Sequence, residues 1–364
     1  MRVPFLDVGA TYTELADELD AAHRRVMERG WFVLGDELGA FEREFAAAVG
    51  ASGACGVASG LDALTLSLRA LGVGPGDEVI VPAMTFVATW LSVSATGATP
   101  VPAEPDPRSG GLDPEAAERA ITDRTAAIVA VHLFGLPVDV EAVEDVSRRH
   151  GLRLVFDAAQ AHGARYRERP IGAFGDASAW SFYPAKNLGA FGDGGAVTFG
   201  DPAVGDRVCS LRNYGSSSKY VHDEQGTNSR LDELQAALLR VKLRHLDAWN
   251  LRRRAVADRY AVELADLPLD LPPEPSGRRS AWHLYVVGVD RRDELADHLA
   301  EADVGTSVHY PVPPHRQAAY AELNDRELPV ADRLAARSLS LPIGPHLTAA
   351  QVDHVVAAVR DFAW

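Results

Sequence analysis

Between residues 50 and 199, short apolar runs alternate with helical stretches, and this alternation constrains the fold more than any other feature of the chain. Helical patterns cover Pro114–Ile121 and Val140–His150, and Gly151 is expected to end the second of these helices as its C-cap. Strands that alternate with helices form a parallel sheet covered on both faces. The sequence therefore predicts an α/β domain, with buried strands at Glu78–Pro82, Ala126–His132, Arg153–Asp157 and Ala177–Phe182.

Helices are also predicted on either side of this region. Two open the chain, over Tyr12–Arg29 and Glu37–Val49, and Asp36 stands where the N-cap of the second would lie. A long, charged helical stretch runs over Leu231–Leu264. Its basic run, Arg240–Arg254, is expected to be a solvated helix face rather than a patch that binds nucleic acid.

A proline-rich segment, Leu267–Gly277, follows that long helical stretch and marks a candidate domain boundary. Beyond it the patterns predict a strand, a helix, a strand and a closing helix, at Trp282–Val289, Arg292–Ala302, Thr306–Tyr310 and Thr348–Phe362. We therefore expect a large domain over residues 1–250 and a smaller α+β domain over residues 251–364.

The composition is that of a folded globular protein, with 364 residues of which 47% are hydrophobic and 24% charged. The 36 basic and 51 acidic residues give a net charge of −15, so neither nucleic acid nor an anionic membrane is an expected partner. The N-terminus shows no apolar run typical of a signal peptide or anchor. The uncharged stretch Val79–Ala103 contains three prolines and predicts strand, helix and strand rather than a membrane span. We expect a cytoplasmic protein.

The chain contains only two cysteines, Cys55 and Cys209. Two are too few for a disulfide framework, and their spacing is not that of metal ligands. We therefore expect buried, free thiols in a reducing compartment and no metal site.

Two charged side chains stand at the ends of predicted buried strands. Asp157 ends one strand, and ligands of open α/β sheets bind at the carboxyl ends of strands, although an aspartate there is also typical of a turn or an N-cap. Lys186 follows the next strand, where a lysine is seldom found unless it is paired or functional, because burial penalises its ammonium group. A desolvated lysine is a good amine nucleophile toward an aldehyde.

A lysine that forms a Schiff base and an aspartate that pairs with a pyridinium nitrogen are what pyridoxal phosphate requires. That cofactor also needs a phosphate site. The segment Ala58–Leu64 places small residues, among them Gly60, at the start of an apolar helix, and the N–H groups at a helix N-terminus favour an anion. The order of these features, with the phosphate site before Asp157 and Lys186, favours this cofactor.

Eight motifs lie in order over nearly the whole chain: Pro4–Asp7, Gly76–Pro82, Thr85–Thr89, Val131–Pro137, Asp157–Gly163, Ser181–Gly189, Asn228–Glu233 and His309–Pro311. Together they resemble the sugar-nucleotide aminotransferases of the DegT/DnrJ/EryC1/StrS family. The resemblance implies a fold-type I pyridoxal phosphate enzyme, with a mostly parallel sheet in the large domain and a smaller α+β C-terminal domain.

The resemblance also implies roles around the cofactor ring. Lys186 would form the Schiff base and Asp157 would pair with the pyridine nitrogen. Gln160 would bond the ring hydroxyl and Phe86 would stack on the ring. From the residues alone, a phenylalanine such as Phe86 in an apolar segment is more often a core side chain, and the alternative for Gln160 is the cap of a turn. His162 is either a donor to Asp157 or a structural histidine.

For the phosphate, the resemblance implies contacts from Ser181, Gly60 and the backbone amide of Leu61. Asn228 would reach the phosphate from the neighbouring subunit, which implies a homodimer with shared active sites. Leu61 stands where many members have threonine or serine, so one hydroxyl contact is lost. Phe156 stands where many members have glutamate, and we assign no role to that difference.

The segments Leu211–Ser216 and Leu239–Asn250, with Lys219 and Tyr220 between them, look most like the subgroup that aminates carbon 3 of a dTDP-3-keto-6-deoxyhexose. Such enzymes take the amino group from glutamate and make amino sugars for antibiotics. Lys219 and Tyr220 are suited to clamp a diphosphate by charge and hydroxyl donation, although a lysine on a surface loop is the alternative.

Three further residues are candidates for the substrate side of the site: Tyr183, His309 and Tyr310. The last two equally finish a predicted strand. Two other functions stay open on this fold: a 4-keto sugar-nucleotide aminotransferase and a non-catalytic regulator. Lys186 argues against a third, a sugar dehydratase, because those relatives carry histidine in place of this lysine.

Overall fold

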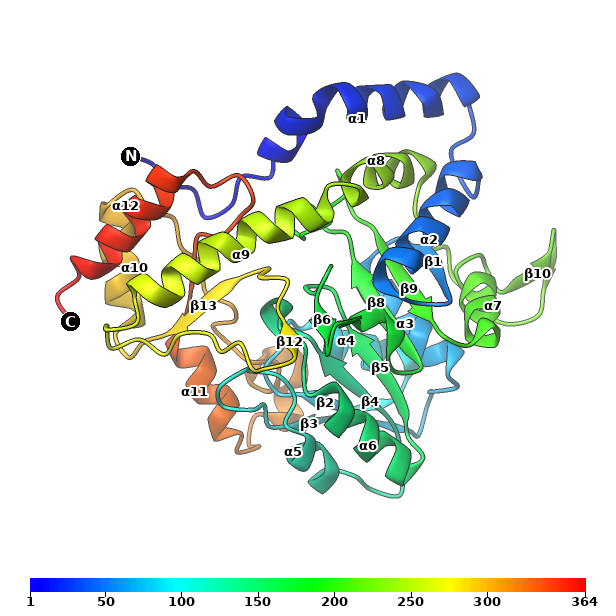
Figure 1. The fold of residues 1–364 in the computed structure, drawn as a ribbon. Coiled ribbons are helices and arrows are strands. Elements are labelled where there is room, and N and C mark those ends of the chain that lie inside the picture. The colour runs from blue at the N-terminus through cyan, green and yellow to red at the C-terminus, as the bar shows by residue number, and fades with distance from the viewer.

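The computed structural model describes all 364 residues. Its centre is a seven-stranded sheet in the order β1-β9-β8-β5-β4-β2-β3 (Figure 1). The strands are β1 (Gly53–Val57), β2 (Glu78–Pro82), β3 (Thr99–Ala103), β4 (Thr125–Val131), β5 (Arg153–Asp157), β8 (Ala177–Ser181) and β9 (Gly195–Phe199). β9 pairs antiparallel with both β1 and β8, and the remaining pairs are parallel. The predicted α/β fold with a mostly parallel sheet is confirmed.

Helices cover both faces of this sheet (Figure 1). Those of the large domain are α1 (Ala10–Arg29), α2 (Asp36–Val49), α3 (Gly60–Ala70), α4 (Ala88–Thr96), α5 (Pro114–Arg119), α6 (Val140–His150), α7 (Pro202–Leu211) and α8 (Glu233–Leu243). Side chains alternate between the faces: Val79 and Val81 of β2 pack with α3 and α4, whereas Ile80 packs with α5 and α6. Both faces are therefore apolar, as the continuous apolar strands of the sequence indicated.

The C-terminal part forms a second core around a two-stranded antiparallel sheet of β13 (Tyr285–Gly288) and β14 (Ser338–Leu341). Its helices are α9 (Leu246–Glu263), α10 (Arg292–Glu301), α11 (Pro329–Arg337) and α12 (Ala349–Arg360). Val3 also belongs to this core and pairs with Val304. The boundary that we propose near residue 250 falls inside α9, which runs through it without a break. None of the helices is both long and apolar enough to cross a bilayer.

Short strands complete the structure. They are β6 (Arg165–Tyr166), β7 (Arg169–Pro170) and β12 (Arg278–Arg279) in one small sheet, and β10 (Ser216–Ser218) and β11 (Val221–His222) in a hairpin. The prediction of a strand over Thr306–Tyr310 is wrong. Within this segment only Ser307 forms a β-bridge, and its partner is Ser340. Side-chain contacts hold the end of that segment instead: His309 bonds the Ser340 hydroxyl, and Tyr310 bonds Gln160.

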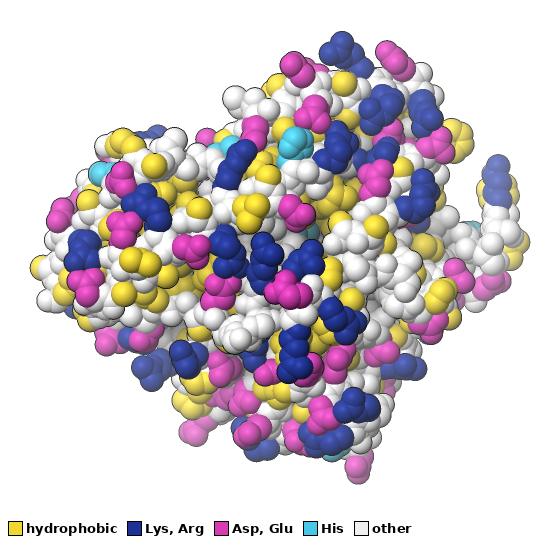
Figure 2. All heavy atoms as spheres, viewed as in Figure 1, with side chains coloured by type: hydrophobic (Ala, Val, Ile, Leu, Met, Phe, Trp, Pro, Cys, Tyr) yellow, Lys and Arg dark blue, Asp and Glu magenta, His cyan; other side chains and the backbone are white.

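The single long helix expected over Leu231–Leu264 is two helices, α8 and α9, which break at Arg244 and His245. Most basic residues along them pair with carboxylates, among them Arg240 with Glu37 and Glu44, but Lys242 and Arg253 are buried and donate to backbone carbonyls. In Figure 2 basic and acidic side chains are interspersed over this surface. The prediction of a solvated face is therefore wrong at Lys242 and Arg253, whose side chains point into the protein.

The N-terminus of α2 is capped from a distant part of the chain and not by Asp36. Its N-cap is Gly35, which has no side chain to cap the helix, and the Asp36 side chain makes no capping bond either. Instead the buried carboxylate of Glu233, at the start of α8, accepts three backbone N–H groups at 2.8–3.0 Å. The donors are Gly35, Glu37 and Leu38. Because Glu233 lies 198 residues after Gly35, no local pattern could reveal this cap.

Replacing Glu233 with alanine is expected to lower the free energy of unfolding by about 2–4 kcal/mol, because buried donors lose a charged acceptor. Asp36→Ala is the matched control: it removes only an exposed ion pair with Arg29 and should change that free energy by less than about 0.5 kcal/mol. Urea unfolding followed by circular dichroism measures both. Equal losses in the two variants would contradict a cap at Glu233.

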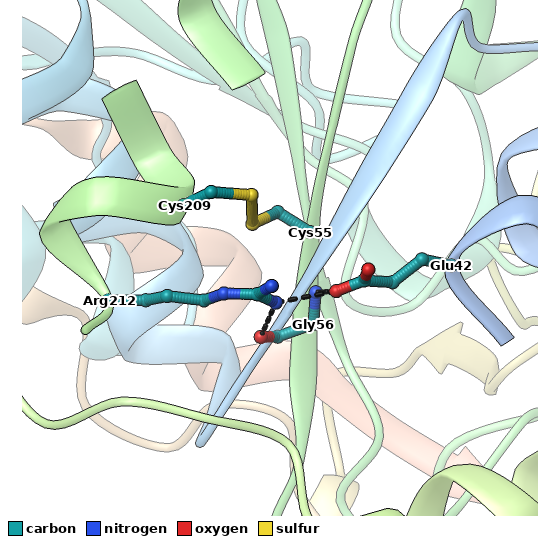
Figure 3. Close-up of a disulfide and its surroundings, with 5 residues drawn as sticks. All are labelled: Glu42, Cys55, Gly56, Cys209 and Arg212. Atoms are coloured by element: carbon teal, nitrogen blue, oxygen red, sulfur yellow. Dashed lines mark hydrogen bonds and ion pairs between the residues drawn. A yellow bond between two sulfur atoms is a disulfide. The ribbon is translucent and has the colours of Figure 1, made fainter. Parts of the chain in front are cut away.

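The two cysteines are paired, which corrects the expectation of free thiols. Cys55 on β1 and Cys209 on α7 form a disulfide with their Cα atoms 6.2 Å apart (Figure 3). Beside it, the Arg212 guanidinium donates to the Gly56 carbonyl at 2.6 Å, and Glu42 accepts from both residues. The sequence could not show this pairing, since 154 residues separate the cysteines and only the packing of α7 on β1 brings them together.

Candidate active site

The carboxyl ends of β4, β5 and β8 meet at one edge of the sheet, where Asp157 lies beside Val131 and Ala179. The Asp157 carboxylate is buried, with the residue 7% exposed. One of its oxygens accepts the Ala159 N–H at 3.1 Å, and the other accepts the Thr89 hydroxyl at 2.9 Å. Each carboxylate oxygen has two lone pairs, so the group keeps the capacity to bind one more donor.

Two titratable groups at this edge, Asp157 and Lys186, shift each other's pKa. Burial lowers the pKa of Lys186 to about 8, and Asp157 opposes the shift. Burial raises the pKa of Asp157, against the bonds from Ala159 and Thr89 and the charge of Lys186. A lysine amine with this pKa is substantially neutral near pH 8, which is the form that attacks an aldehyde.

Three histidines near Lys186 are neutral at pH 7, because burial holds each pKa low. The pKa of His162 falls to about 3 and that of His309 to about 4, and the pKa of His283 lies well below its ordinary value. The charge of Lys186 adds to the effect in all three. His162 packs among aromatic rings and neither of its ring nitrogens bonds Asp157, so it is not a donor to that carboxylate.

The side-chain amide of Gln160 is fixed by two contacts. Its oxygen accepts the Phe134 N–H at 2.6 Å, and its nitrogen donates to the Tyr310 hydroxyl oxygen at 2.9 Å. The second N–H of that amide remains available for a hydroxyl or phenolate oxygen. Gln160 is therefore more than the cap of a turn.

Phe86 lies at the open side of this cluster. Its ring centroid is 5.6 Å from that of Tyr310, and its side chain is 54% exposed. That exposure excludes a plain core role, and a flat aromatic ligand seated beside Asp157 and Gln160 would cover the ring.

The expected phosphate site is assembled beside the cluster. The carboxyl ends of β1 and β8 lie there on either side of the amino end of β9, with Gly195 paired to both Val57 and Ser181. The next helix, α3, begins at Gly60, where a Cβ atom would approach the Ser181 Cβ to 2.6 Å, so glycine is required. The Ser59 hydroxyl caps the Asp62 N–H. The N–H groups of Gly60 and Leu61, at the first positions of the helix, precede its internal hydrogen bonds and suit an anion.

The remaining sequence-predicted residues lie further away. Asn228 lines a separate cavity of about 430 Å³ with Ala58 and Arg230. Lys219 and Tyr220 lie at the turn of the β10–β11 hairpin, which projects from the body of the molecule (Figures 1 and 2). Tyr220 is 84% exposed. Within one chain these three residues do not join the Lys186 cluster.

Tyr183 and His309 border the cluster itself. Tyr183 is exposed, and its backbone carbonyl accepts the backbone N–H of Lys186 at 2.8 Å. The His309 ring stacks on Phe5 of the N-terminal segment, with centroids 5.7 Å apart. A contact with Phe5 at the start of the chain was not foreseen.

Sequence reasoning missed three side chains that support the cluster: Thr89, Asn187 and His283. Thr89 and Asn187 lie within family motifs, but no role was assigned to them from the sequence. The Asn187 amide oxygen accepts from the His283 ring and the amide nitrogen donates to the Ala281 carbonyl, and so Asn187 fixes the segment after Lys186 against the C-terminal part. A threonine at the start of a helix gives a weak local signal, and His283 gives none, because its place depends on how the two parts of the chain pack.

Comparison with known proteins agrees with this geometry. The profile of the DegT/DnrJ/EryC1/StrS aminotransferase family matches residues 13–360. The chain belongs to this family. It is 55% identical to the dTDP-3-amino-3,4,6-trideoxy-alpha-D-glucose transaminase of Streptomyces venezuelae, over 100% of this chain and 96% of that protein. It is 56% identical to the erythromycin biosynthesis sensory transduction protein EryC1 of Saccharopolyspora erythraea, over 99% of both chains.

Two solved structures are also similar to this chain. The S. venezuelae protein DesV matches with a TM-score of 0.98 at 55% identity, over 99% of this chain and 98% of that one. NtdA of Bacillus subtilis, solved with bound pyridoxamine phosphate, matches with a TM-score of 0.92 at 30% identity, over 99% and 84%. This family member is a sugar aminotransferase, and pyridoxal phosphate is its cofactor. The unused acceptor of Asp157, the unused donor of Gln160 and the glycine at position 60 fit that cofactor.

Borohydride treatment of the holoenzyme is expected to fix the cofactor covalently to Lys186, as peptide mapping will show. Lys186→Ala should slow transamination by about 10²–10⁴-fold, since the variant lacks both the nucleophile and the proton carrier. Lys242 is an internal control, because burial also lowers its pKa to about 8 but its amine donates to the Gly189 carbonyl. A label on Lys242 would overturn the assignment.

Proposed function

We propose that this aminotransferase moves the amino group of glutamate to the C3 keto group of a dTDP-3-keto-6-deoxyhexose, in the synthesis of a deoxyamino sugar. The observation that carries the proposal is the meeting of Asp157, Gln160 and Lys186 at one edge of the sheet, each with a group left free for the cofactor. The names of two relatives support the position of amination. Besides the S. venezuelae transaminase, the dTDP-3-amino-3,6-dideoxy-alpha-D-galactopyranose transaminase of Aneurinibacillus thermoaerophilus is 45% identical, over 100% of both chains.

In this proposal the residues divide the work by chemistry. When bound, pyridoxal phosphate supplies the aldehyde that takes up the amino group and a ring that holds the electrons of the broken C–H bond. Lys186 provides the amine that holds the aldehyde and, once released, the base that carries the proton from the α-carbon of glutamate. Asp157 accepts the ring N–H and keeps the ring an electron acceptor. Phe86 covers one face of the ring, which excludes water from it.

The phosphate of the cofactor lies at the start of α3 in this proposal, held by the Gly60 and Leu61 N–H groups and the Ser181 hydroxyl. Leu61 has no hydroxyl to add, so the backbone groups carry more of the binding. Asn228 of a second copy would add a neutral donor.

A homodimer with shared active sites accounts for the exposed apolar surface next to Asn228. Four consecutive hydrophobic residues, 31–34, are 38–62% exposed. They adjoin the start of α8, since Phe32 accepts the Glu233 N–H, and Val33 lines the same cavity as Asn228. A second copy of the chain would cover these side chains and bring its own hairpin, with Lys219 and Tyr220, to the site of its partner.

A panel of dTDP-linked sugars tests the reaction and separates it from the alternatives. With glutamate present, we expect release of 2-oxoglutarate with 3-keto-6-deoxyhexoses and at least about tenfold lower kcat/KM with 4-keto isomers, because the wrong carbonyl is misplaced from the reacting carbon. Turnover of 4-keto sugars alone would support the 4-aminotransferase. No turnover of any keto sugar by cofactor-loaded protein would favour the regulator, a role suggested by the name of the S. erythraea relative.

Lys219→Ala is expected to weaken the half-reaction with the keto sugar and to spare the half-reaction with glutamate. A lost charge-assisted hydrogen bond to the diphosphate reduces kcat/KM for the sugar by roughly 10- to 150-fold. Single-turnover absorbance measures the two halves separately. Equal losses in both would mean that Lys219 supports the cofactor or the fold. No loss in either would mean that Lys219 is a solvated surface residue without a role in binding the sugar.

The same variant tests the shared site when it is mixed with Lys186→Ala. If the hairpin serves the partner subunit, a hybrid dimer contains one site with both lysines intact, and wild-type sugar kinetics return in a fraction of the sites. Exchange of subunits is verified by native mass spectrometry. No recovery after verified exchange would place Lys219 and Lys186 in the same subunit's site.

A further inference from the structure

Two threonine hydroxyls form a buried chain that ends on the catalytic carboxylate. The Thr89 hydroxyl donates to Asp157 at 2.9 Å, and the Thr85 and Thr89 hydroxyl oxygens are 2.8 Å apart. Thr85 is 2% exposed and Thr89 is fully buried. Neither hydroxyl is available to solvent, so the chain is part of the protein interior and not a surface feature.

The direction of donation along this chain follows from the carboxylate. An ionised carboxyl group only accepts hydrogen bonds, so the single proton of the Thr89 hydroxyl points at Asp157. The Thr89 oxygen is then left as the acceptor for Thr85. Each member polarises the next, which strengthens the bond that reaches the carboxylate.

The position of Thr89 in the backbone adds to this effect. It lies in the first turn of α4, so the carboxylate oxygen that it holds lies near the positive end of that helix. The same short segment carries Phe86, whose backbone oxygen accepts the Thr89 N–H at 3.1 Å. One short segment therefore presents an aromatic ring to the open side and one hydroxyl to Asp157, with the Thr85 hydroxyl behind it.

We propose that Thr89, supported by Thr85, is a positioning residue that holds Asp157 ionised and aimed at the ring nitrogen of the cofactor. The inference rests on the proposed function, in which Asp157 pairs with that nitrogen. It goes further by assigning the strength of that pairing to the threonine chain. Because Asp157 is buried, one missing donor is not replaced by water, and the effect should be specific for the nitrogen.

The test compares two ligands of the cofactor-free protein. Pyridoxamine phosphate carries the ring nitrogen and forms no covalent bond to Lys186, and its 1-deaza analogue has a C–H group in place of that nitrogen. Thr89→Val keeps the shape of the side chain and removes the hydroxyl. We expect it to weaken binding of pyridoxamine phosphate by roughly 10- to 100-fold, as for a hydrogen bond to a charged group, and binding of the analogue by less than about twofold. Calorimetric titration gives both dissociation constants.

Two further variants grade the effect. Thr89→Ser retains the hydroxyl and should bind pyridoxamine phosphate within about threefold of wild type, whereas Thr85→Val removes only the outer hydroxyl and should cost an intermediate factor of about 2 to 5. Equal weakening of both ligands by Thr89→Val would make Thr89 merely structural and overturn the proposal. Unchanged binding of pyridoxamine phosphate would overturn it as well.

Asp157→Asn separates this inference from the proposed function beneath it. If Asp157 pairs with the ring nitrogen, this variant loses the preference for pyridoxamine phosphate over the 1-deaza analogue. A preference that survives in Asp157→Asn would mean that the role of Asp157 itself is wrong. A preference lost in Asp157→Asn but kept in Thr89→Val would refute only the threonine chain. Thermal unfolding of each cofactor-free variant confirms that the protein tested is folded.

Discussion

A carboxylate in a protein interior must be supplied with donors, and at Asp157 this requirement organises three separate parts of the chain. The strand β5 delivers the residue, and its own backbone continues the sheet, where the Asp157 carbonyl accepts the His132 N–H at 3.0 Å. The turn after the strand returns the Ala159 N–H to the side chain, and α4 brings Thr89. Burying this group without such partners would cost several kcal/mol. The packing of α4 is therefore needed for the chemistry of the site as well as for the fold, because α4 supplies one of the donors.

The neighbouring groups depend on the same arrangement. The strand that precedes Lys186, β8, pairs with β5 at the same edge of the sheet. Burial at this edge lowers the pKa of Lys186 and keeps the adjacent histidines neutral. Gln160 is tied on one side to the Phe134 turn and on the other to Tyr310 from the C-terminal part. The site is therefore assembled from both parts of the chain, although its charges come from the large domain alone.

Much of this could be predicted from the sequence, because the deciding patterns are local. Buried parallel strands are continuous apolar runs, so β2 and β5 were placed with their correct ends, and Gly151 adopts the left-handed conformation expected of a C-cap. What could not be predicted depends on contacts between distant residues. Glu233 caps α2, Cys55 forms a disulfide with Cys209, and Tyr310 bonds Gln160 instead of lying in the predicted strand. Each of these joins segments more than a hundred residues apart.

The placement of Val3 in the core of the C-terminal part has a consequence for the order in which the protein is completed. Val3 packs with Val359 and Phe362 and pairs with Val304, and both ends of the chain lie on this part of the molecule (Figure 1). During synthesis Val3 is made long before Val304, Val359 and Phe362 exist. The central sheet has no such dependence, since all its strands lie within residues 53–199. The sheet can thus form early, whereas the second core closes only after the segment that carries Val359 and Phe362 has been made.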